Sequence, residues 1–284
     1  MTGVRVVARD RRDDLGEGPL WSERDDAIYW TDILGHRINR LSLGTSAVES
    51  WRMPDYTGWV IERERGGFIA GIGREIVELD ADGAIQGLLA PLEPDRADNR
   101  VNDAKADAAG RVWAGSMPIT ADKPTGAFYR LDLDGAATRV DDGYRIANGP
   151  AISGDGRTLL HTDSGLGIIY RFALDADGKL GERAEFIRFE PHWGKPDGMT
   201  FDATGGLWVA CWGGGCVMRF TPDGQRDRII ELPASQISSC TFAGANLDRM
   251  FVTSAAVDVD EPLGGALFEV DPGCRGLPTH RYRG

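Results

Sequence analysis

Four polar residues that open similar turn motifs give the first indication of chemistry in this chain. Glu17 and Asn148 each precede Gly-Pro, Asp197 precedes Gly-Met, and Asn102 precedes Asp-Ala. Together they offer two carboxylates and two amides, an oxygen-rich set that suits a hard or borderline divalent cation. Any one of these motifs alone is an ordinary turn former. Their shared place in a repeat favours ligands instead.

That repeat runs through the whole chain. Each unit reads as a turn-rich opening, an apolar strand, a Gly or Asp turn and a second apolar or aromatic strand. Subtracting successive positions gives steps of 40, 45, 46, 49 and 42 residues. A period of about 40 to 50 residues, with short strands and no long helical stretch, is typical of β-propeller blades. The six openings are at Glu17, Thr57, Asn102, Asn148, Asp197 and Ser239.

The pattern predicts an all-β fold, a six-bladed β-propeller with four-stranded antiparallel blades that occupies residues 1–284 as a single domain. The unit that starts at residue 197 shows three hairpin-connected strands, and RDRIIELP supplies a fourth. The segment VRVVARD near the N-terminus has no partner in its own unit. We expect it to form the outer strand of the last blade and so to close the ring.

A propeller explains how distant polar residues meet. Each blade begins with its innermost strand, so residues at the same place in successive repeats lie at the same height around the central channel. We therefore expect Glu17, Asn102, Asn148 and Asp197 to converge on the axis.

Composition excludes several classes of protein. With 32 Lys and Arg against 44 Asp and Glu, the net charge is -12, which argues against nucleic-acid binding and indicates a solvated acidic rim. The start lacks the apolar core of a signal peptide, and no apolar run approaches the roughly 18 residues of a membrane span. We expect a cytoplasmic protein with no membrane or obligate protein partner.

Cysteine and histidine residues give no strong alternative. The four cysteines, at positions 211, 216, 240 and 274, lack zinc-finger spacing, and we interpret them as buried free thiols. There is no HExxH motif and no GxSxG nucleophile elbow. His161 lies in an alternating strand, which favours a hydrogen-bonded structural histidine over a catalytic base.

Several motifs resemble the gluconolactonase, regucalcin and senescence-marker-protein family, over nearly the whole chain and in the same order. The resemblance implies a six-bladed propeller with one divalent cation at the channel mouth, and hydrolysis of sugar lactones. It is closest to bacterial aldonolactonases. The matching segments are LGEGPLW (15–21), RVNDAKAD (100–107), ANGPAIS (147–153), HTDS (161–164) and PDGMTFD (196–202).

The resemblance also implies roles for individual residues. It makes Glu17, Asn148 and Asp197 the metal ligands. It makes Arg100 and Asn102 substrate-binding residues, and Asp103 a residue that binds or orients the sugar or the ion. The cation itself, Ca, Zn, Mn, Mg or Fe(II), is left open, because oxygen ligands accept all of these.

Lactone hydrolysis needs an attacking water and stabilisation of charge on the carbonyl oxygen. A cation with open coordination positions can polarise the carbonyl or activate water. Asp197 is then the candidate general base, since a carboxylate at the metal can accept a proton from that water. The planar fork of Arg100 suits paired sugar oxygens, and the alternative for this residue is an exposed salt bridge at the rim.

Some features leave the substrate open. Certain family members place a sugar-contacting Glu after the equivalent of residues 115–117, and residues 118–126 here contain none. Either Asp122 or Lys123 replaces it, or the contact is absent. His192 and Trp193 either wall the mouth or pack their own loop. Two other functions stay open: a phosphotriesterase or esterase that uses the same metal site, and a non-catalytic calcium-binding propeller.

Overall fold

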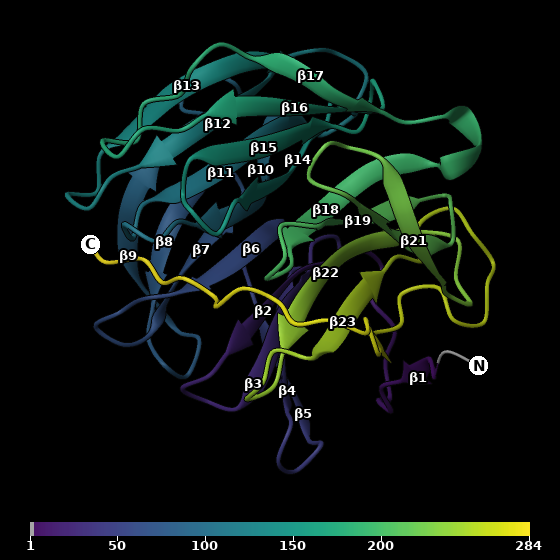
Figure 1. The fold of residues 1–284 in the computed structure, drawn as a ribbon. Helices are drawn as coiled ribbons and strands as arrows, with labels where there is room; N and C mark the ends of the chain where they lie inside the picture. Colours follow the sequence, from purple (N-terminus) through teal and green to yellow (C-terminus); the bar gives the residue numbers. More distant parts are fainter. Residues whose placement is uncertain (1–2) are drawn as a thin grey trace.

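Six four-stranded antiparallel sheets surround a central axis in the computed structural model, which describes residues 3–284 (Figure 1). The predicted six-bladed β-propeller is confirmed, and the first two residues of its predicted range lie outside the described part. Each innermost strand contacts the innermost strands of the two neighbouring blades. These six strands are β2 (Gly16–Ser22), β6 (Thr57–Glu62), β10 (Asn99–Ala106), β14 (Ala147–Ile152), β18 (Lys195–Phe201) and β22 (Ile237–Ala243).

The remaining strands complete the blades in chain order. They are β1 (Arg5–Val6), β3 (Ala27–Asp32), β4 (Arg37–Ser42), β5 (Val48–Arg52), β7 (Phe68–Ile72), β8 (Glu75–Leu79), β9 (Ile85–Pro91), β11 (Val112–Pro118), β12 (Gly126–Leu131), β13 (Ala137–Tyr144), β15 (Thr158–Asp163), β16 (Ile168–Ala173), β17 (Ala184–Arg188), β19 (Leu207–Trp212), β20 (Cys216–Phe220), β21 (Arg226–Glu231), β23 (Arg249–Ser254) and β24 (Phe268–Val270). One short 3-10 helix, η1 (Pro191–Trp193), precedes β18. Across residues 3–284 no helix has the length and apolar character needed to cross a membrane.

The N-terminal strand closes the ring, as the sequence predicts. β1 pairs antiparallel with β24, which gives the last sheet the order β1-β24-β23-β22. The strand itself is only two residues long, and Val7 N extends the pairing by donating to Leu267 O at 2.9 Å. The first and last strands of the chain therefore share one sheet, and β1 is its outermost strand.

Apolar packing lies between blades. Each of six clusters of buried side chains combines residues from two neighbouring blades, one cluster for every blade interface. For example, Trp208 of the fifth blade packs in one cluster with Phe242 of the sixth, with ring centroids 6.3 Å apart. The core is therefore distributed around the ring, between blades, rather than gathered at the axis.

A repeated hydrogen-bond device fixes the turn between the first two strands of two blades. The motif Asp-x-x-Gly-x-x-Trp occurs at Asp107 to Trp113 and at Asp202 to Trp208. In each, Oδ1 of the Asp accepts from two backbone N–H groups of its own turn, and Oδ2 accepts from the indole Nε1, at 2.9 Å and 3.0 Å respectively. A buried indole N–H is thereby satisfied, which allows a large side chain into the blade interface.

Every innermost strand carries an irregularity at the polar opening that the sequence identifies. A β-bulge inserts an extra residue, bends the strand and changes the direction of a side chain. At the openings, such bends change the direction in which the polar side chains point. The register shifts lie at Glu17/Leu20, Thr57/Trp59, Val101/Ala104, Asn148/Ala151, Pro196/Met199 and Ile237/Ser239.

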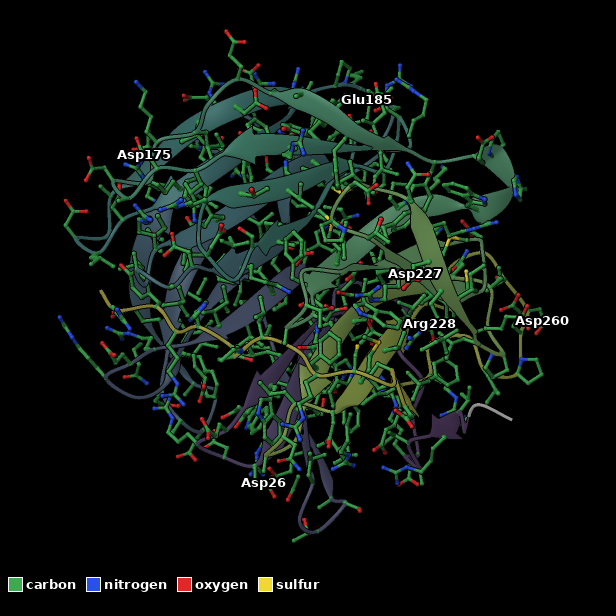
Figure 2. All side chains as sticks on the ribbon, in the orientation of Figure 1. Asp26, Asp175, Glu185, Asp227, Arg228 and Asp260 are labelled. Carbon is green, nitrogen blue, oxygen red and sulfur yellow. The ribbon has the colours of Figure 1, made fainter. Side chains whose placement is uncertain are left out.

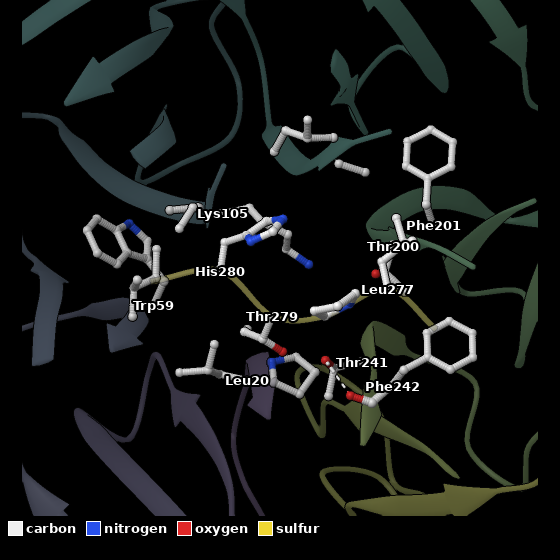
Figure 3. A pocket seen from close by; sticks show the side chains of 18 of the residues that line it. Leu20, Trp59, Lys105, Thr200, Phe201, Thr241, Phe242, Leu277, Thr279 and His280 are labelled. Carbon is white, nitrogen blue, oxygen red and sulfur yellow. Dashed lines mark hydrogen bonds between the residues drawn. The ribbon is translucent and has the colours of Figure 1, made fainter. Parts of the chain in front are cut away.

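The C-terminal strap, residues 276–284, crosses one face of the disc (Figure 1). It covers a cavity of about 290 Å³ at that end of the channel, and Figure 3 shows Leu277, Thr279 and His280 of the strap over Lys105 and Thr241. Backbone hydrogen bonds tie the strap to several blades, among them Gly276 N to Leu247 O at 2.8 Å. This end of the channel is therefore covered by the chain itself.

Charged side chains lie at the perimeter, as the acidic composition predicts. Asp26, Asp175, Glu185 and Asp260 are exposed and lie at the edge of the disc (Figure 2). The net negative charge therefore includes a solvated rim, in addition to the buried carboxylates described next.

Candidate active site

A cavity of about 270 Å³, here called the site cavity, brings together five of the predicted residues. Glu17, Arg100, Asn102, Asn148 and Asp197 all line it, although 180 positions separate the first from the last. Each is at most 6% exposed. They lie on the innermost strands β2, β10, β14 and β18 at the bulged openings, so the shared register does place them around one point of the channel.

A chain of side-chain hydrogen bonds orients the amides. Arg100 Nη1 donates to Asn102 Oδ1 at 2.6 Å, and Asn102 Nδ2 donates to Asn148 Oδ1 at 2.8 Å and to Ala147 O at 2.9 Å. Asn148 Nδ2 donates to Ser164 Oγ at 3.1 Å, and that hydroxyl donates to Pro196 O at 2.6 Å. The network crosses from the third blade to the fifth and holds the Asn148 side chain in one orientation.

Two of the buried carboxylates are strained electrostatically. Burial raises the pKa of Glu17 well above its usual value, and the charges of Asp197 and Asp103 raise it further. Burial likewise raises the pKa of Asp197, with a second contribution from Asp103. Both shifts have the ordinary cause that a charged group is removed from water and placed near like charge. The site thus concentrates negative charge that the protein only partly balances.

Arg100 is a buried cation without a carboxylate partner within the described chain. It is 6% exposed, forms no ion pair, and burial lowers its pKa to about 10. Only Nη1 donates to another described residue, to Asn102 Oδ1 and to Val101 O. Arg100 is therefore not the exposed salt-bridge residue that was the alternative prediction from the sequence. The other guanidinium N–H groups are available to a ligand in the cavity.

Asp103 occupies a different level of the channel. It lines the strap-covered cavity rather than the site cavity. Its Oδ1 accepts from Ala104 N at 2.7 Å and its Oδ2 from Gly149 N at 2.9 Å. Burial raises the pKa of Asp103, and the positive charge of Lys105, which lines the same strap-covered cavity, opposes that rise. Its described contacts therefore fix the bulged backbone beneath the site.

The residues present fit a divalent cation. Asp197 Oδ1 is buried and has no hydrogen-bond partner in the described structure. A divalent cation would offset the burial and the like-charge repulsion that raise the pKa of Glu17 and Asp197. Within residues 3–284 no three His, Cys, Asp or Glu side chains group as a metal cluster, so the predicted ligand set depends on the amide of Asn148.

Sequence reasoning missed several residues that line the cavity. Tyr56 directly precedes the Thr57 opening, Ser164 follows β15, and Lys195 and Trp212 are register partners at one end of the β18–β19 pair. The available signal was position, because all four lie at the same end of a blade as the polar openings.

Other predicted candidates lie elsewhere. Trp193 packs against Phe189 and Phe220 with ring centroids 5.6 Å and 6.0 Å away, and neither Trp193 nor His192 lines the site cavity. The same holds for Asp122 and Lys123, which are both exposed. All four cysteines are free, as predicted; Cys211, Cys216 and Cys240 are buried, whereas Cys274 is only half-buried.

His161 is a buried residue of β15 that lines no cavity described above. Its ring stacks on Phe128 with centroids 3.7 Å apart and meets the edge of Tyr144. Contrary to the expectation of a hydrogen-bonded histidine, neither ring nitrogen has a partner among the described residues. The residue belongs to the packed interface between the third and fourth blades.

Comparison with known proteins places this chain in a family. Residues 15–256 match the family described as SMP-30/Gluconolactonase/LRE-like region. The chain is 35% identical over 272 residues to a 6-deoxy-6-sulfogluconolactonase of Pseudomonas putida, covering 92% of this chain and 93% of that protein. It is 34% identical over 292 residues to a pentonolactonase of Haloferax volcanii, covering 99% and 98%.

A solved structure shows the same architecture. The fold matches that of a calcium-binding protein, regucalcin, from Agrobacterium tumefaciens, with a TM-score of 0.93, 28% sequence identity, and coverage of 99% of this chain and 98% of that one. The family match spans most of the sequence, and the similarity to both relatives runs nearly end to end. The chain belongs to the SMP-30/gluconolactonase/LRE-like family.

Proposed function

We propose that this protein hydrolyses sugar aldonolactones to aldonic acids with the help of one divalent cation. The observation that carries the proposal is the buried Asp197 Oδ1, which has no protein partner and lies in the same cavity as Arg100. Relatives that cover more than nine tenths of the chain are named as lactonases. A cavity of about 270 Å³ lies just below the usual range for drug-sized ligands, and a monosaccharide lactone is a correspondingly small ligand.

Glu17, Asn148 and Asp197 are the residues that would hold the cation. When bound, a divalent ion supplies Lewis-acid polarisation of a carbonyl or acidification of a water. Asn102 keeps Asn148 oriented through the 2.8 Å hydrogen bond to Oδ1, in the manner of an outer-shell partner that fixes a ligand. Ser164 holds the other side of the same amide.

In the proposed reaction, Asp197 acts as the general base. One of its oxygens takes a proton from a water molecule as the water oxygen bonds to the lactone carbonyl carbon. The ring C–O bond then breaks, and Asp197 returns the proton to the leaving alkoxide oxygen, which becomes a hydroxyl group. Water is consumed, one C–O bond forms and one breaks, so atoms and protons balance.

Arg100 would bind oxygen atoms of the sugar. Its N–H groups other than Nη1 have no acceptor in the described protein, and a planar guanidinium suits paired oxygen acceptors. Asp103 acts from below, because its carboxylate fixes the backbone at Gly149 and Ala104 rather than entering the site cavity. We therefore assign Asp103 a positioning role rather than direct contact with the sugar.

The proposal is tested with the purified protein, pH-indicator assays on gluconolactone, xylonolactone and arabinonolactone, and Ca, Zn, Mn, Mg and Fe(II) added separately. We expect cation-dependent ring opening and a loss of about 100-fold or more in Asp197→Asn. Asp122→Asn is the matched control, because that carboxylate is exposed and outside the site cavity. Its activity should equal that of the wild type.

Other outcomes would replace the proposal. Cation binding by calorimetry without turnover of any lactone would indicate a calcium-binding propeller. Faster turnover of paraoxon than of every lactone would indicate a phosphotriesterase that uses the same site.

A further inference from the structure

The lining of the site cavity contains more free hydrogen-bond donors than free acceptors. A sugar hydroxyl group both donates and accepts, whereas the lining side chains of Arg100, Lys195 and Trp212 can only donate. A side chain that accepts from a sugar hydroxyl group must therefore contain an oxygen atom. The lining residues with a side-chain oxygen are Glu17, Tyr56, Asn102, Asn148, Ser164 and Asp197.

Three of these oxygen atoms already accept hydrogen bonds within the protein. Asn102 Oδ1 accepts from Arg100 Nη1 at 2.6 Å, and Asn148 Oδ1 accepts from Asn102 Nδ2 at 2.8 Å. Ser164 Oγ accepts from Asn148 Nδ2 at 3.1 Å and donates to Pro196 O at 2.6 Å. The amides and the serine hydroxyl thus serve to orient one another.

The carboxylates of Glu17 and Asp197 have other roles in the proposed function, because they would hold the cation and Asp197 would also take the proton of the attacking water. Tyr56 Oη is the remaining side-chain oxygen of the lining. The hydrogen bonds of Tyr56 to other described residues involve only its backbone. Its hydroxyl group is therefore free to bind a ligand in the cavity.

Tyr56 lies near Arg100. Both residues line the site cavity, from neighbouring blades. Burial lowers the pKa of Arg100, and Glu17 and Tyr56 are the next groups that act on it, in the opposite direction. A phenol that accepts and a guanidinium that only donates can therefore bind neighbouring oxygen atoms of one sugar.

The position of Tyr56 is fixed by its own turn. Its backbone N–H donates to Asp55 Oδ1 at 2.7 Å, and its carbonyl oxygen accepts from Gly73 N at 2.7 Å. The ring meets the ring of His36 edge to face, with centroids 5.1 Å apart. A tyrosine held in this way contributes a hydrogen-bonding group with little loss of conformational entropy on binding.

We propose that the Tyr56 hydroxyl group accepts a hydrogen bond from a hydroxyl group of the lactone, beside the oxygen atoms that Arg100 binds. Tyr56 is then a substrate-binding residue that favours polyhydroxylated lactones. The inference rests on the proposed lactonase function and adds a substrate contact to the same site. Because Tyr56 is only half-buried, water competes for its hydroxyl group, and the expected effect is that of one ordinary hydrogen bond.

Tyr56→Phe tests the proposal, because it removes one oxygen atom and keeps the ring. We expect kcat/KM on D-glucono-1,5-lactone to fall by about 3- to 10-fold. The same kinetics are then measured on the 2-, 3-, 4- and 6-deoxy forms of this lactone. For one of them, the loss caused by the missing substrate hydroxyl in the wild type should disappear in Tyr56→Phe, because the two partners of one hydrogen bond are not additive.

Tyr170→Phe is the matched control. Tyr170 is a half-buried tyrosine of β16 that does not line the site cavity. Its kcat/KM on each lactone should equal that of the wild type. A general change of the fold or of cation binding in Tyr56→Phe would lower the activity on every lactone by the same factor, so the comparison between lactones isolates the hydrogen bond.

Activity of Tyr56→Phe within twofold of the wild type on D-glucono-1,5-lactone, or additive losses with all four deoxy lactones, would overturn the inference while the lactonase proposal stands. If no lactone is opened at all, the lactonase proposal fails. Calorimetric affinities of wild type and Tyr56→Phe for D-glucono-1,5-lactam then decide the inference separately, because lactam binding requires no turnover. Equal affinities, or no binding to either protein, would reject the role of Tyr56.

Discussion

The side-chain amide of Asn102 donates to Asn148 Oδ1 at 2.8 Å, across the boundary between the third and fourth blades. Both amide hydrogens of Asn102 are used, since Nδ2 also donates to Ala147 O at 2.9 Å. Its Oδ1 accepts from Arg100. Asn102 therefore links the residue expected to bind sugar oxygens with a residue expected to bind the cation, and a change at Asn102 should affect both.

Asn102→Ala should weaken cation binding by about 10-fold, because the loss of a residue that orients a ligand typically costs 10- to 100-fold in affinity. It should also raise KM, since Arg100 loses the acceptor at 2.6 Å that fixes its guanidinium. Isothermal titration with the activating cation and lactone kinetics measure the two effects. Asn39→Ala is the control, because Asn39 is a buried amide of β4 that does not line the site cavity. Equal cation affinity in wild type and Asn102→Ala would contradict this assignment.

Glu17→Gln and Asp197→Asn should each stabilise the cation-free protein by about 1–2 kcal/mol. Each change removes a desolvated carboxylate that its buried neighbours repel, which is the cause of the raised pKa of Glu17 and Asp197. With the cation at 100 times its Kd, the wild type should gain about 2.7 kcal/mol and the variants much less. The order of the melting temperatures should therefore reverse. Variants that melt below the wild type without the cation would show that these carboxylates do not repel one another.

His161 should make the stability depend on pH. Burial lowers the pKa of His161 to about 3 from a usual value of 6.5. Between these pH values the unfolded chain binds a proton that the folded protein does not. The free energy of unfolding therefore decreases as the pH falls. The contribution of His161 is complete above about pH 6.5 and is lost at about 1.4 kcal/mol per pH unit below it.

Urea unfolding of His161→Leu measures this effect against the wild type. Between about pH 6.5 and 4.5, the wild type should lose about 2 to 3 kcal/mol more than the variant. His192→Leu serves as the control, because His192 is an exposed residue. The free energy of unfolding of this variant should depend on pH as steeply as that of the wild type. Parallel pH profiles for the wild type and His161→Leu would refute the role of this residue.

Tyr282 should anchor the C-terminal strap. It is 1% exposed, its backbone N–H donates to Glu62 O at 2.9 Å, and its hydroxyl donates to Asp132 O at 3.1 Å. Tyr282→Ala should cost about 3–5 kcal/mol through the cavity it leaves, and Tyr282→Phe about 1 kcal/mol through the lost hydrogen bond. Denaturant unfolding gives both values. Turnover per folded molecule should not change in Tyr282→Phe, because the strap covers the end of the channel opposite to the site cavity; a large loss of turnover would show that the two ends are coupled.

Much of the fold could be predicted from the sequence because propeller blades repeat. The spacing of the openings from Glu17 to Ser239, the alternating strands and the unpaired VRVVARD segment predicted six blades and the closure of the ring. The register argument also brought Glu17, Asn148 and Asp197 to one cavity. These features follow from local periodicity, which a single sequence records directly.

Other features depend on contacts between blades. Tyr56, Trp212 and Ile119 line the site cavity, but apart from their place at the end of a blade nothing in their local sequence distinguishes them from other residues there. The sequence likewise could not separate Asp103 from Asn102, although adjacent residues on a bulged strand face different levels of the channel. The strap provides a further example, because one of its hydrogen bonds joins Tyr282 to Glu62, more than 200 positions away in the sequence.

By itself, the amino-acid sequence determined the number of blades, the closing strand and the polar residues that open the blades, since each follows from the repeat. Only the tertiary structure decided which side chains line the mouth of the site cavity. It also decided that Asp197 lies in the site cavity and Asp103 in the strap-covered one, and that the amide of Asn102 donates to that of Asn148. The physical reason is that direction and burial are set by packing between blades, where the partners of a residue come from distant parts of the chain.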